Sequence, residues 1–176
     1  MDTAQDYFSL FDLTPGFDVD LERLSNRYRA LQREVHPDRF AHAGEAEQLQ
    51  AVQRTAHLND ALATLKSPLK RAVYLLHLQG VELGPESSRA MDPSFLMEQM
   101  ELREGLEAVR AAVDPEDALA SLERRVKADW DQLVREFKER LEQGALDGAA
   151  DSVRKMQFLD KMHQEIERLE DQLMDD

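Results

Sequence analysis

Apolar residues recur every three or four positions through most of this 176-residue chain, which is the spacing of one face of an α-helix. The pattern is plainest in residues 18–35, where Leu24, Tyr28, Leu31 and Val35 share a face. A strand places alternate residues on opposite faces, so this spacing does not suit one. Few glycines and few aromatic residues are also typical of helices. The sequence therefore predicts an all-α protein.

Prolines and capping residues set the ends of the expected helices in the first half of the chain. Asp18 or Asp20 can cap the first helix, and Pro37 ends it, because the residue before a proline disfavours the helical conformation. A second helix begins near Gly44 and pauses at Ser67-Pro68, and a further stretch continues to Gly80. The second helix is expected to run through the apolar residues Leu49, Val52, Ala56 and Ala63.

The second half of the chain predicts three more helices. Asp92-Pro93 and Asp114-Pro115 each provide an N-cap carboxylate followed by a proline at the first helical position. Three helices with short connections form an antiparallel bundle. Its expected core stripes are Phe95, Leu102, Leu106, Val109 and Val113, then Leu119, Leu122, Val126, Trp130, Leu133, Phe137 and Leu141, then Leu159, Met162, Ile166, Leu169 and Leu173.

The stretch "GVELGPESSRAMD" between the two halves is rich in Gly, Pro and Ser and breaks the helical periodicity. The chain is long enough for two small helical units. We therefore expect one domain at residues 1–76 and another at residues 92–176, joined by a connecting segment at residues 77–91.

Composition excludes several classes of function. The chain contains no cysteine, so it has no disulfides, thiolate nucleophiles or cysteine-ligated metal centres of its own. It lacks a basic leader and any apolar run of about 18 residues, so we expect a cytoplasmic protein without a membrane partner. The formal net charge of −14 argues against nucleic-acid binding. Residues 76–176 carry 25 acidic and 13 basic side chains, which indicates that the two halves meet different partners.

The tripeptide His36-Pro37-Asp38 places two titratable side chains around a proline at the end of a helix. An enzyme could use His36 as a general base oriented by Asp38, or His36, Asp38 and His42 as metal ligands. Both uses lack the converging groups that such sites need, because no nucleophile, oxyanion hole or helical pair of histidines accompanies the tripeptide. The other two interpretations are a simple turn and a docking loop.

Basic residues on the preceding helix favour the docking loop. A step of about 100° per residue puts Arg29 and Arg33 opposite the apolar stripe, with Arg23 beside them. Charges at this spacing are commonly just a solvated face. Next to a constrained loop, they can also raise the rate of encounter with an acidic partner.

Residues 93–113 have more apolar side chains than one helix face can use. Leu96, Met97 and Met100 lie roughly 100° or more from the expected core stripe, beside Glu101 and Glu104. They either pack against the first domain or form a binding patch. In such a patch flexible methionines adapt to a partner and the carboxylates form the rim.

The first half resembles the J-domain co-chaperones, whose signature is a basic helix, a His-Pro-Asp loop and a following antiparallel helix. The segment "DYFSLFDLTP" is similar to the opening of that family, and "LNDALATLKSPLKRAVYLL" to its closing helices. The matching positions there are Asn59, Ala61, Leu65, Pro68, Arg71 and Tyr74. The resemblance implies that His36, Pro37 and Asp38, supported by Arg23, Arg29 and Arg33, stimulate ATP hydrolysis by a DnaK-like chaperone, and that the chain itself is no enzyme. Arg39 stands where that family more often has lysine.

The segments "FLMEQMELRE" and "ADSVRKMQFLDKM" extend the resemblance to the HscB family, the J proteins of bacterial iron-sulfur cluster assembly. This implies an L-shaped, all-α protein without a cofactor, in which a J domain with its helical hairpin joins a C-terminal three-helix bundle. It further implies that the bundle binds a cluster scaffold protein of the IscU type and delivers it to a chaperone of the HscA type. The implied scaffold contacts are Leu96, Met97, Met100, Glu101, Glu104 and Phe158.

Two points remain open at this stage. Phe158 lies at the edge of its core stripe, so periodicity alone predicts a core residue. The alternative function is a general J-domain co-chaperone for unfolded clients, although the chain lacks the Gly/Phe-rich linker and the zinc-binding cysteines of such proteins. Mitochondrial relatives carry an additional cysteine-bearing N-terminal segment, so we expect a bacterial protein.

Overall fold

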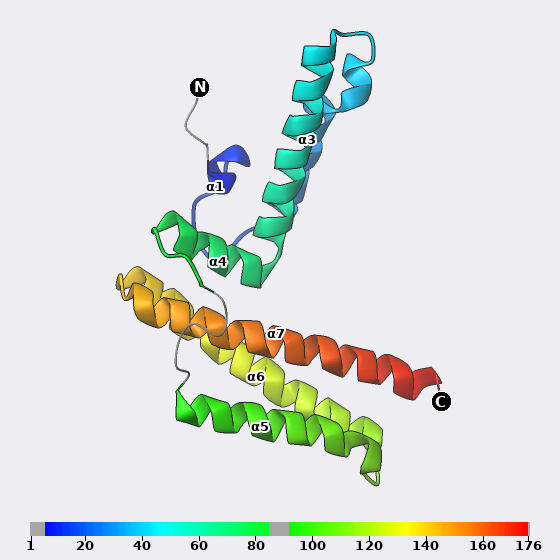
Figure 1. Ribbon diagram of the computed structural model, residues 1–176, viewed down its shortest axis with the longest axis vertical. Helices are drawn as coiled ribbons and strands as arrows, with labels where there is room; N and C mark the ends of the chain where they lie inside the picture. The colour runs from blue at the N-terminus through cyan, green and yellow to red at the C-terminus, as the bar shows by residue number, and fades with distance from the viewer. Residues whose placement is uncertain (1–5, 85–91, 176) are drawn as a thin grey trace. The chain divides into compact units, whose positions relative to one another are not determined.

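The computed structural model describes residues 6–84 and 92–175, and every regular element in these two ranges is a helix. The chain divides into two compact units, Met1–Leu78 and Gln79–Asp176 (Figure 1). The prediction of an all-α fold is therefore confirmed. Within the described ranges no helix is both long and apolar enough to cross a membrane.

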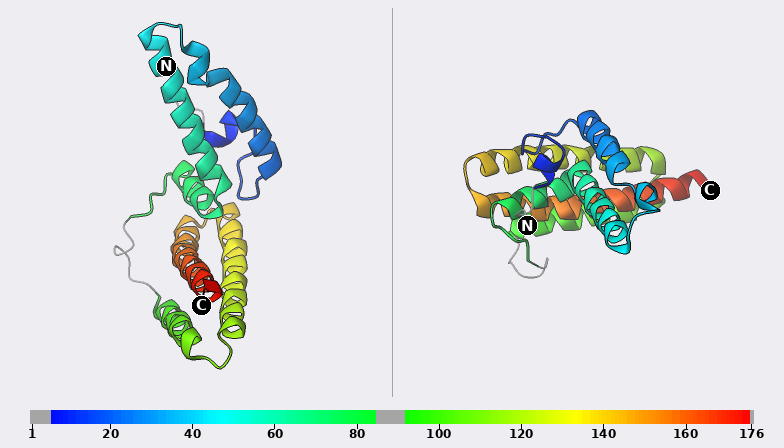
Figure 2. Two further views of the ribbon diagram at one scale, coloured as in Figure 1. Left: turned by 90° about the vertical axis from the view of Figure 1, so that its right-hand side faces the viewer. Right: turned by 90° about the horizontal axis from the view of Figure 1, so that it is seen from above.

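The first unit is built on an antiparallel hairpin of two long helices, which lie side by side in the further views of Figure 2. Its helices are α1 (Tyr7–Leu10), α2 (Leu21–Val35), the 3₁₀ helix η1 (Pro37–Phe40), α3 (Glu45–Lys66) and α4 (Pro68–Leu78). The carboxylate of Asp20 caps α2 by accepting a hydrogen bond from the Arg23 amide at 2.9 Å. His36 ends α2 with an extended ψ of 130°, as the following Pro37 requires. Both predicted ends of this helix are confirmed.

Two side chains at the base of the hairpin connect its helices to the segments around it. Arg71 of α4 is buried, donates to the carbonyls of Leu65 (2.8 Å) and Phe17, and lies 5.4 Å from the centre of the Phe17 ring. Burial lowers the pKa of Arg71, and the nearby Asp18 carboxylate opposes this shift. Tyr74 accepts a hydrogen bond from the Tyr7 amide at 2.9 Å, which joins α1 to α4. These bonds fix the base and leave the opposite end of the hairpin to carry the loop.

The bounds predicted for α3 are confirmed, but the face that it buries is not the expected one. Leu49 and Val52 are exposed, as are Ala56 and Ala63. The buried residues are Ala51, Leu58, Ala61 and Leu65. Because α3 carries apolar residues on both sides, periodicity cannot choose between them. Each side carries two alanines, so side-chain size does not distinguish the two sides either, and the buried side is set by the long-range packing of α2 against α3.

The second unit contains three α-helices that pack along one another (Figure 1). They are α5 (Pro93–Ala108), which continues into the 3₁₀ helix η3 (Val109–Ala111), then α6 (Pro115–Glu142) and α7 (Leu146–Asp175). Asp92 and Asp114 cap α5 and α6 as predicted, accepting from the amides of Ser94 (3.1 Å) and Asp117 (3.0 Å). Gly144 has a φ of +69°, a conformation that L side chains rarely adopt, and it reverses the chain between α6 and α7. The prediction of a three-helix bundle is confirmed.

Most of the predicted stripe residues form the core of the bundle. The buried ones are Phe95, Leu102, Val109, Leu119, Leu122, Val126, Leu133, Phe137, Leu159, Met162, Ile166 and Leu169. Leu106, Trp130, Leu141 and Leu173 are half-buried. The prediction that Val113 is a core residue is wrong, because its side chain is fully exposed. The α-helix ends at Ala108, so the step of 100° per residue no longer applies when the chain reaches Val113.

The connecting segment predicted at residues 77–91 lies only partly within the described residues. His77 and Leu78 still belong to α4, and Gly80, with a φ of +78°, follows the helix end. Residues 85–91 lie outside the described ranges.

Candidate functional site

The His36-Pro37-Asp38 loop follows α2 directly and is held by local hydrogen bonds. His36 ends α2 and also caps η1, since its Nδ1 accepts a hydrogen bond from the Asp38 amide at 3.2 Å. Pro37 stands at the first position of η1, where no amide hydrogen is needed. The side chain of Asp38 is 90% exposed and that of His36 is 43% exposed. The loop therefore presents a carboxylate and an imidazole to solvent in one defined arrangement.

The Nδ1 atom of His36 also lies 3.4 Å from Oδ2 of Asp38. One nitrogen cannot accept a proton from the amide and donate one to the carboxylate in the same protonation state. The bond from the Asp38 amide fits the neutral ring, whose proton is then on Nε2. In that state the carboxylate of Asp38 is free to accept hydrogen bonds from a partner.

Arg39 fixes the loop to the end of α2. Its Nη1 donates to the carbonyls of Arg33 (3.1 Å) and Glu34 (3.5 Å), in the last turn of the helix. These carbonyls have no partner within the helix, and a cation is favourable at this end of the helix dipole. The sequence showed the charge of Arg39 but not this contact, which depends on the fold of the loop. Gln48 of α3 holds the segment that follows the loop, because its side-chain amide donates to the carbonyls of Ala41 and Ala43.

The three arginines expected to support the loop have different surroundings. Arg23 forms an ion pair with Asp12 at 3.1 Å and donates to the Asp12 carbonyl, so its charge is partly neutralised. Arg29 donates within its own helix, to the Ser25 carbonyl and to the side-chain oxygen of Asn26. Among the described residues, neither Arg29 nor Arg33 forms an ion pair, and both are exposed. The free positive charge of α2 is thus concentrated on the two turns nearest the loop.

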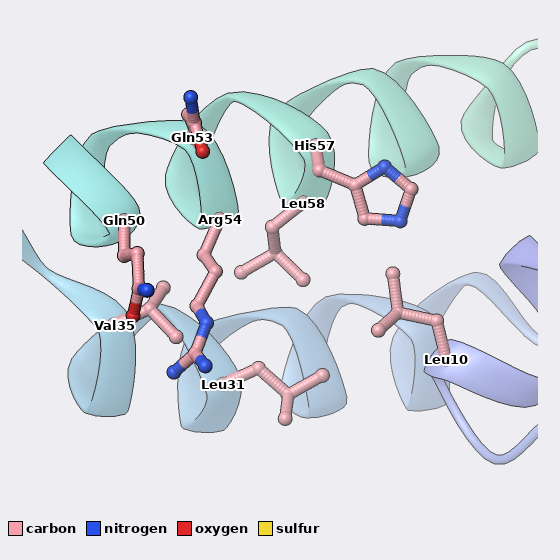
Figure 3. A pocket seen from close by; sticks show the side chains of 8 residues that line it. All are labelled: Leu10, Leu31, Val35, Gln50, Gln53, Arg54, His57 and Leu58. Carbon is pink, nitrogen blue, oxygen red and sulfur yellow. The ribbon is translucent and has the colours of Figure 1, made fainter. Parts of the chain in front are cut away.

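A pocket of about 400 Å³ opens between α1, α2 and α3 (Figure 3). Leu31, Val35 and Leu58 form its apolar part together with Leu10 of α1. The side chains of Gln50, Gln53, Arg54 and His57 of α3 complete the lining. Val35 directly precedes His36, so an apolar surface reaches the base of the loop. Periodicity predicted that Leu31 and Val35 share the apolar face of α2, but it did not predict the pocket beside them.

Within the described part of the chain, no group of three or more His, Cys, Asp or Glu side chains could hold a metal ion. This bears on the interpretation of His36, Asp38 and His42 as metal ligands. Among the described residues, the structure therefore gives this interpretation no support.

The second candidate surface lies on α5. Leu96, Met97 and Met100 are 45%, 65% and 61% exposed, although each is large and apolar. Their neighbours Glu101 and Glu104 are also exposed, and Glu101 forms an ion pair with Arg125 of α6 at 2.9 Å. We call these five residues the α5 patch. Its apolar part lies off the core of the bundle, as the helical positions predicted.

Phe158 of α7 lies beneath α5 and is only 8% exposed. Its ring meets that of Phe95 edge to face, with centres 5.7 Å apart. Arg103 lies 5.7 Å from the centre of the Phe158 ring, and Lys155 lies 5.1 Å from that of Phe95. Periodicity predicted Phe158 as a core residue, and its burial agrees. Arg103 and Lys155 add cations beside the α5 patch that sequence reasoning missed, although Lys155 precedes Phe158 by one helical turn.

Comparisons with known proteins cover both units. Residues 91–167 match the family described as the HSCB C-terminal oligomerisation domain. The "Co-chaperone protein HscB homolog" of Vibrio cholerae is 48% identical over 168 residues, which cover 96% of this chain and 98% of that protein.

Two solved structures are similar in fold and in sequence. Chaperone HscB from Vibrio cholerae matches with a TM-score of 0.89 and 48% identity, covering 96% of this chain and 99% of that one. Human co-chaperone protein HscB matches with a TM-score of 0.88 and 34% identity, covering 97% of this chain and 84% of that one. The arrangement of helices described above is therefore shared with co-chaperones of known structure.

Proposed function

Because the chain belongs to the HscB co-chaperone family, we propose that it connects a DnaK-like chaperone of the HscA type to an iron-sulfur cluster scaffold of the IscU type. It binds the scaffold through its second unit and stimulates the chaperone's ATPase through its first, in the bacterial cytoplasm. Cluster transfer from the scaffold, and with it the maturation of iron-sulfur proteins, is the process that this coupling serves.

The first unit contacts the chaperone through His36, Pro37 and Asp38. The exposed Asp38 carboxylate pairs with a cation of the chaperone, while the bonds of His36 and Arg39 keep the loop in its docking geometry. A preorganised loop loses little conformational entropy on binding, which favours a tight contact over a small area. Arg29 and Arg33 supply most of the attraction to an acidic surface, and Arg23, paired with Asp12, contributes less.

The observation that carries the proposal is the exposure of three large apolar side chains on α5, in a unit whose predicted stripe residues are otherwise buried or half-buried except for Val113. A contiguous apolar patch with a charged rim is typical of a protein interface. Leu96, Met97 and Met100 are the expected centre of the scaffold contact, with Glu101 and Glu104 at its edge. Phe158 supports the patch from below through Phe95.

The experiment that tests this proposal measures the steady-state ATPase rate of the chaperone. The rate is recorded with this protein, with the scaffold and with both. We expect this protein and the scaffold together to stimulate hydrolysis by more than the product of their separate effects. The reason is that one chain then holds the chaperone and the scaffold at the same time. Equal stimulation with and without scaffold would contradict a coupling role.

Replacing Arg29 and Arg33 together with glutamate is expected to slow association with the chaperone at least about tenfold, because the reversed charges repel an acidic docking surface. Dissociation should change less. Stopped-flow or surface plasmon resonance measurements at several NaCl concentrations provide the rates.

The matched control replaces Lys66 and Lys70 with glutamate, which changes the net charge equally elsewhere in the same unit. Its association rate should stay close to that of the unmodified protein. Electrostatic steering would be the wrong explanation if added salt left the association rate of the unmodified protein unchanged.

A further inference from the structure

A second groove lies in the C-terminal unit, between the first turns of α6 and the last turns of α7. Its volume is about 200 Å³. The α5 patch lies on α5, between Leu96 and Glu104, whereas residues of α6 and α7 line the groove. The groove therefore belongs to other helices than the surface assigned above to the scaffold (Figure 1). Glu101 of the α5 patch nevertheless pairs with Arg125 of α6, two residues from Glu123.

The inside of the groove is apolar. Leu119 and Ile166 form a buried floor, Leu173 is half-buried, and Met174 stands at the edge with 75% of its surface exposed. A further apolar side chain in this space would remove the exposed parts of Leu173 and Met174 from water. A flexible, unbranched methionine at the edge can adjust to the shape of what enters.

Three carboxylates surround this apolar floor: Glu116 and Glu123 from α6 and Glu170 from α7. None of them forms an ion pair with another described residue. Other acids of the same two helices do, such as Asp131 with Lys127 at 3.0 Å and Glu136 with Arg140 at 3.1 Å. The groove thus combines free negative charge with an open apolar interior.

We propose that this groove binds a basic amphipathic segment of a partner protein, one that places a large apolar side chain on the floor and Lys or Arg side chains beside the three glutamates. A helix with its apolar and basic residues one turn apart has this arrangement. The same unit of a second copy would bring like charge instead, because residues 76–176 hold 25 acidic and 13 basic side chains. The inference is independent of the function assigned to the α5 patch and the loop.

The probe is a short fluorescent peptide with Leu and Lys at helical spacing, and its binding to the full chain is followed by anisotropy. We expect saturable binding to one site that weakens as salt is added. A peptide with Ser in place of every Leu tests the apolar floor, and one with Glu in place of every Lys tests the charge. Both should bind at least tenfold more weakly.

Glu123→Lys combined with Glu170→Lys is expected to weaken binding of the Leu/Lys peptide at least tenfold. The control combines Glu107→Lys with Glu142→Lys, which makes the same change in net charge at exposed positions outside the groove. It should bind nearly as the unmodified chain does. Far-UV circular dichroism confirms that both variants fold.

Three results would overturn the proposal. The first is an equal loss of binding in the groove variant and the control variant. The second is undiminished binding of the Ser/Lys peptide, since charge alone would then explain the contact. The third is a dimer of the unmodified chain in analytical ultracentrifugation that the groove variant abolishes, which would assign the groove to a second copy.

Discussion

Asp38→Asn or His36→Gln is expected to abolish the stimulation of the chaperone's ATPase by this protein, with little effect on its stability. The Asp38 side chain is 90% exposed, so its loss leaves no gap in the core. At a docked interface, however, the partner's cation would lose its charge partner. Such a loss typically costs roughly 2 to 5 kcal/mol, or a roughly 30-fold or greater reduction in affinity.

The control for the loop variants is Glu47→Gln, which removes an exposed negative charge from the first turn of α3. This variant should stimulate the ATPase normally. All three variants should keep the melting temperature of the unmodified protein within a few degrees. Full stimulation by Asp38→Asn and His36→Gln would show that chaperone docking does not use the loop.

Replacing Leu96, Met97 and Met100 together with alanine is expected to remove most of the affinity for the scaffold. Each truncation of an interface anchor costs on the order of 1 to 2 kcal/mol or more, although such losses do not add exactly. Because all three side chains are largely exposed, the folded state loses little packing. Calorimetric titration with the scaffold measures the affinity, and thermal unfolding measures the stability.

Leu102→Ala is the contrasting variant, since Leu102 is on the same helix but buried in the bundle. It should lower the free energy of unfolding by roughly 2 to 5 kcal/mol, because a cavity forms in the core. The scaffold affinity of its folded form should change less than that of the triple variant. If the triple variant instead melted far below the unmodified protein and bound the scaffold normally, these residues would be packing residues.

The helix ends were predictable because they depend on short-range rules. The Asp20, Asp92 and Asp114 carboxylates cap the first turns that follow them, and Pro37 disfavours helix at the residue before it. The four stripe residues of α5 and η3 are buried or half-buried, namely Phe95, Leu102, Leu106 and Val109. Val113, which lies beyond η3, is exposed. A spacing of 100° per residue predicts burial only as far as the α-helix continues, and α5 ends at Ala108.

Long-range contacts explain what sequence reasoning missed. Leu49 and Val52 of α3 are exposed because α2 packs against another face of the helix. Since α3 carries apolar residues on more than one side, no local pattern indicates which side is buried. The pairing of Arg23 with Asp12 crosses from α2 to the segment after α1. The exposure of the α5 patch was predictable, because its three apolar residues exceeded what one helix face could bury.

The most direct test of a single chain that couples both partners is a mixture of two defective variants. Asp38→Asn should still bind the scaffold, and the triple alanine variant should still stimulate the chaperone. Mixed in equal amounts with chaperone and scaffold, they are expected to give no more ATPase activity than the triple variant alone, because no molecule in the mixture does both. Restoration of the full scaffold-dependent rate by the mixture would contradict the proposal that one chain must hold chaperone and scaffold together.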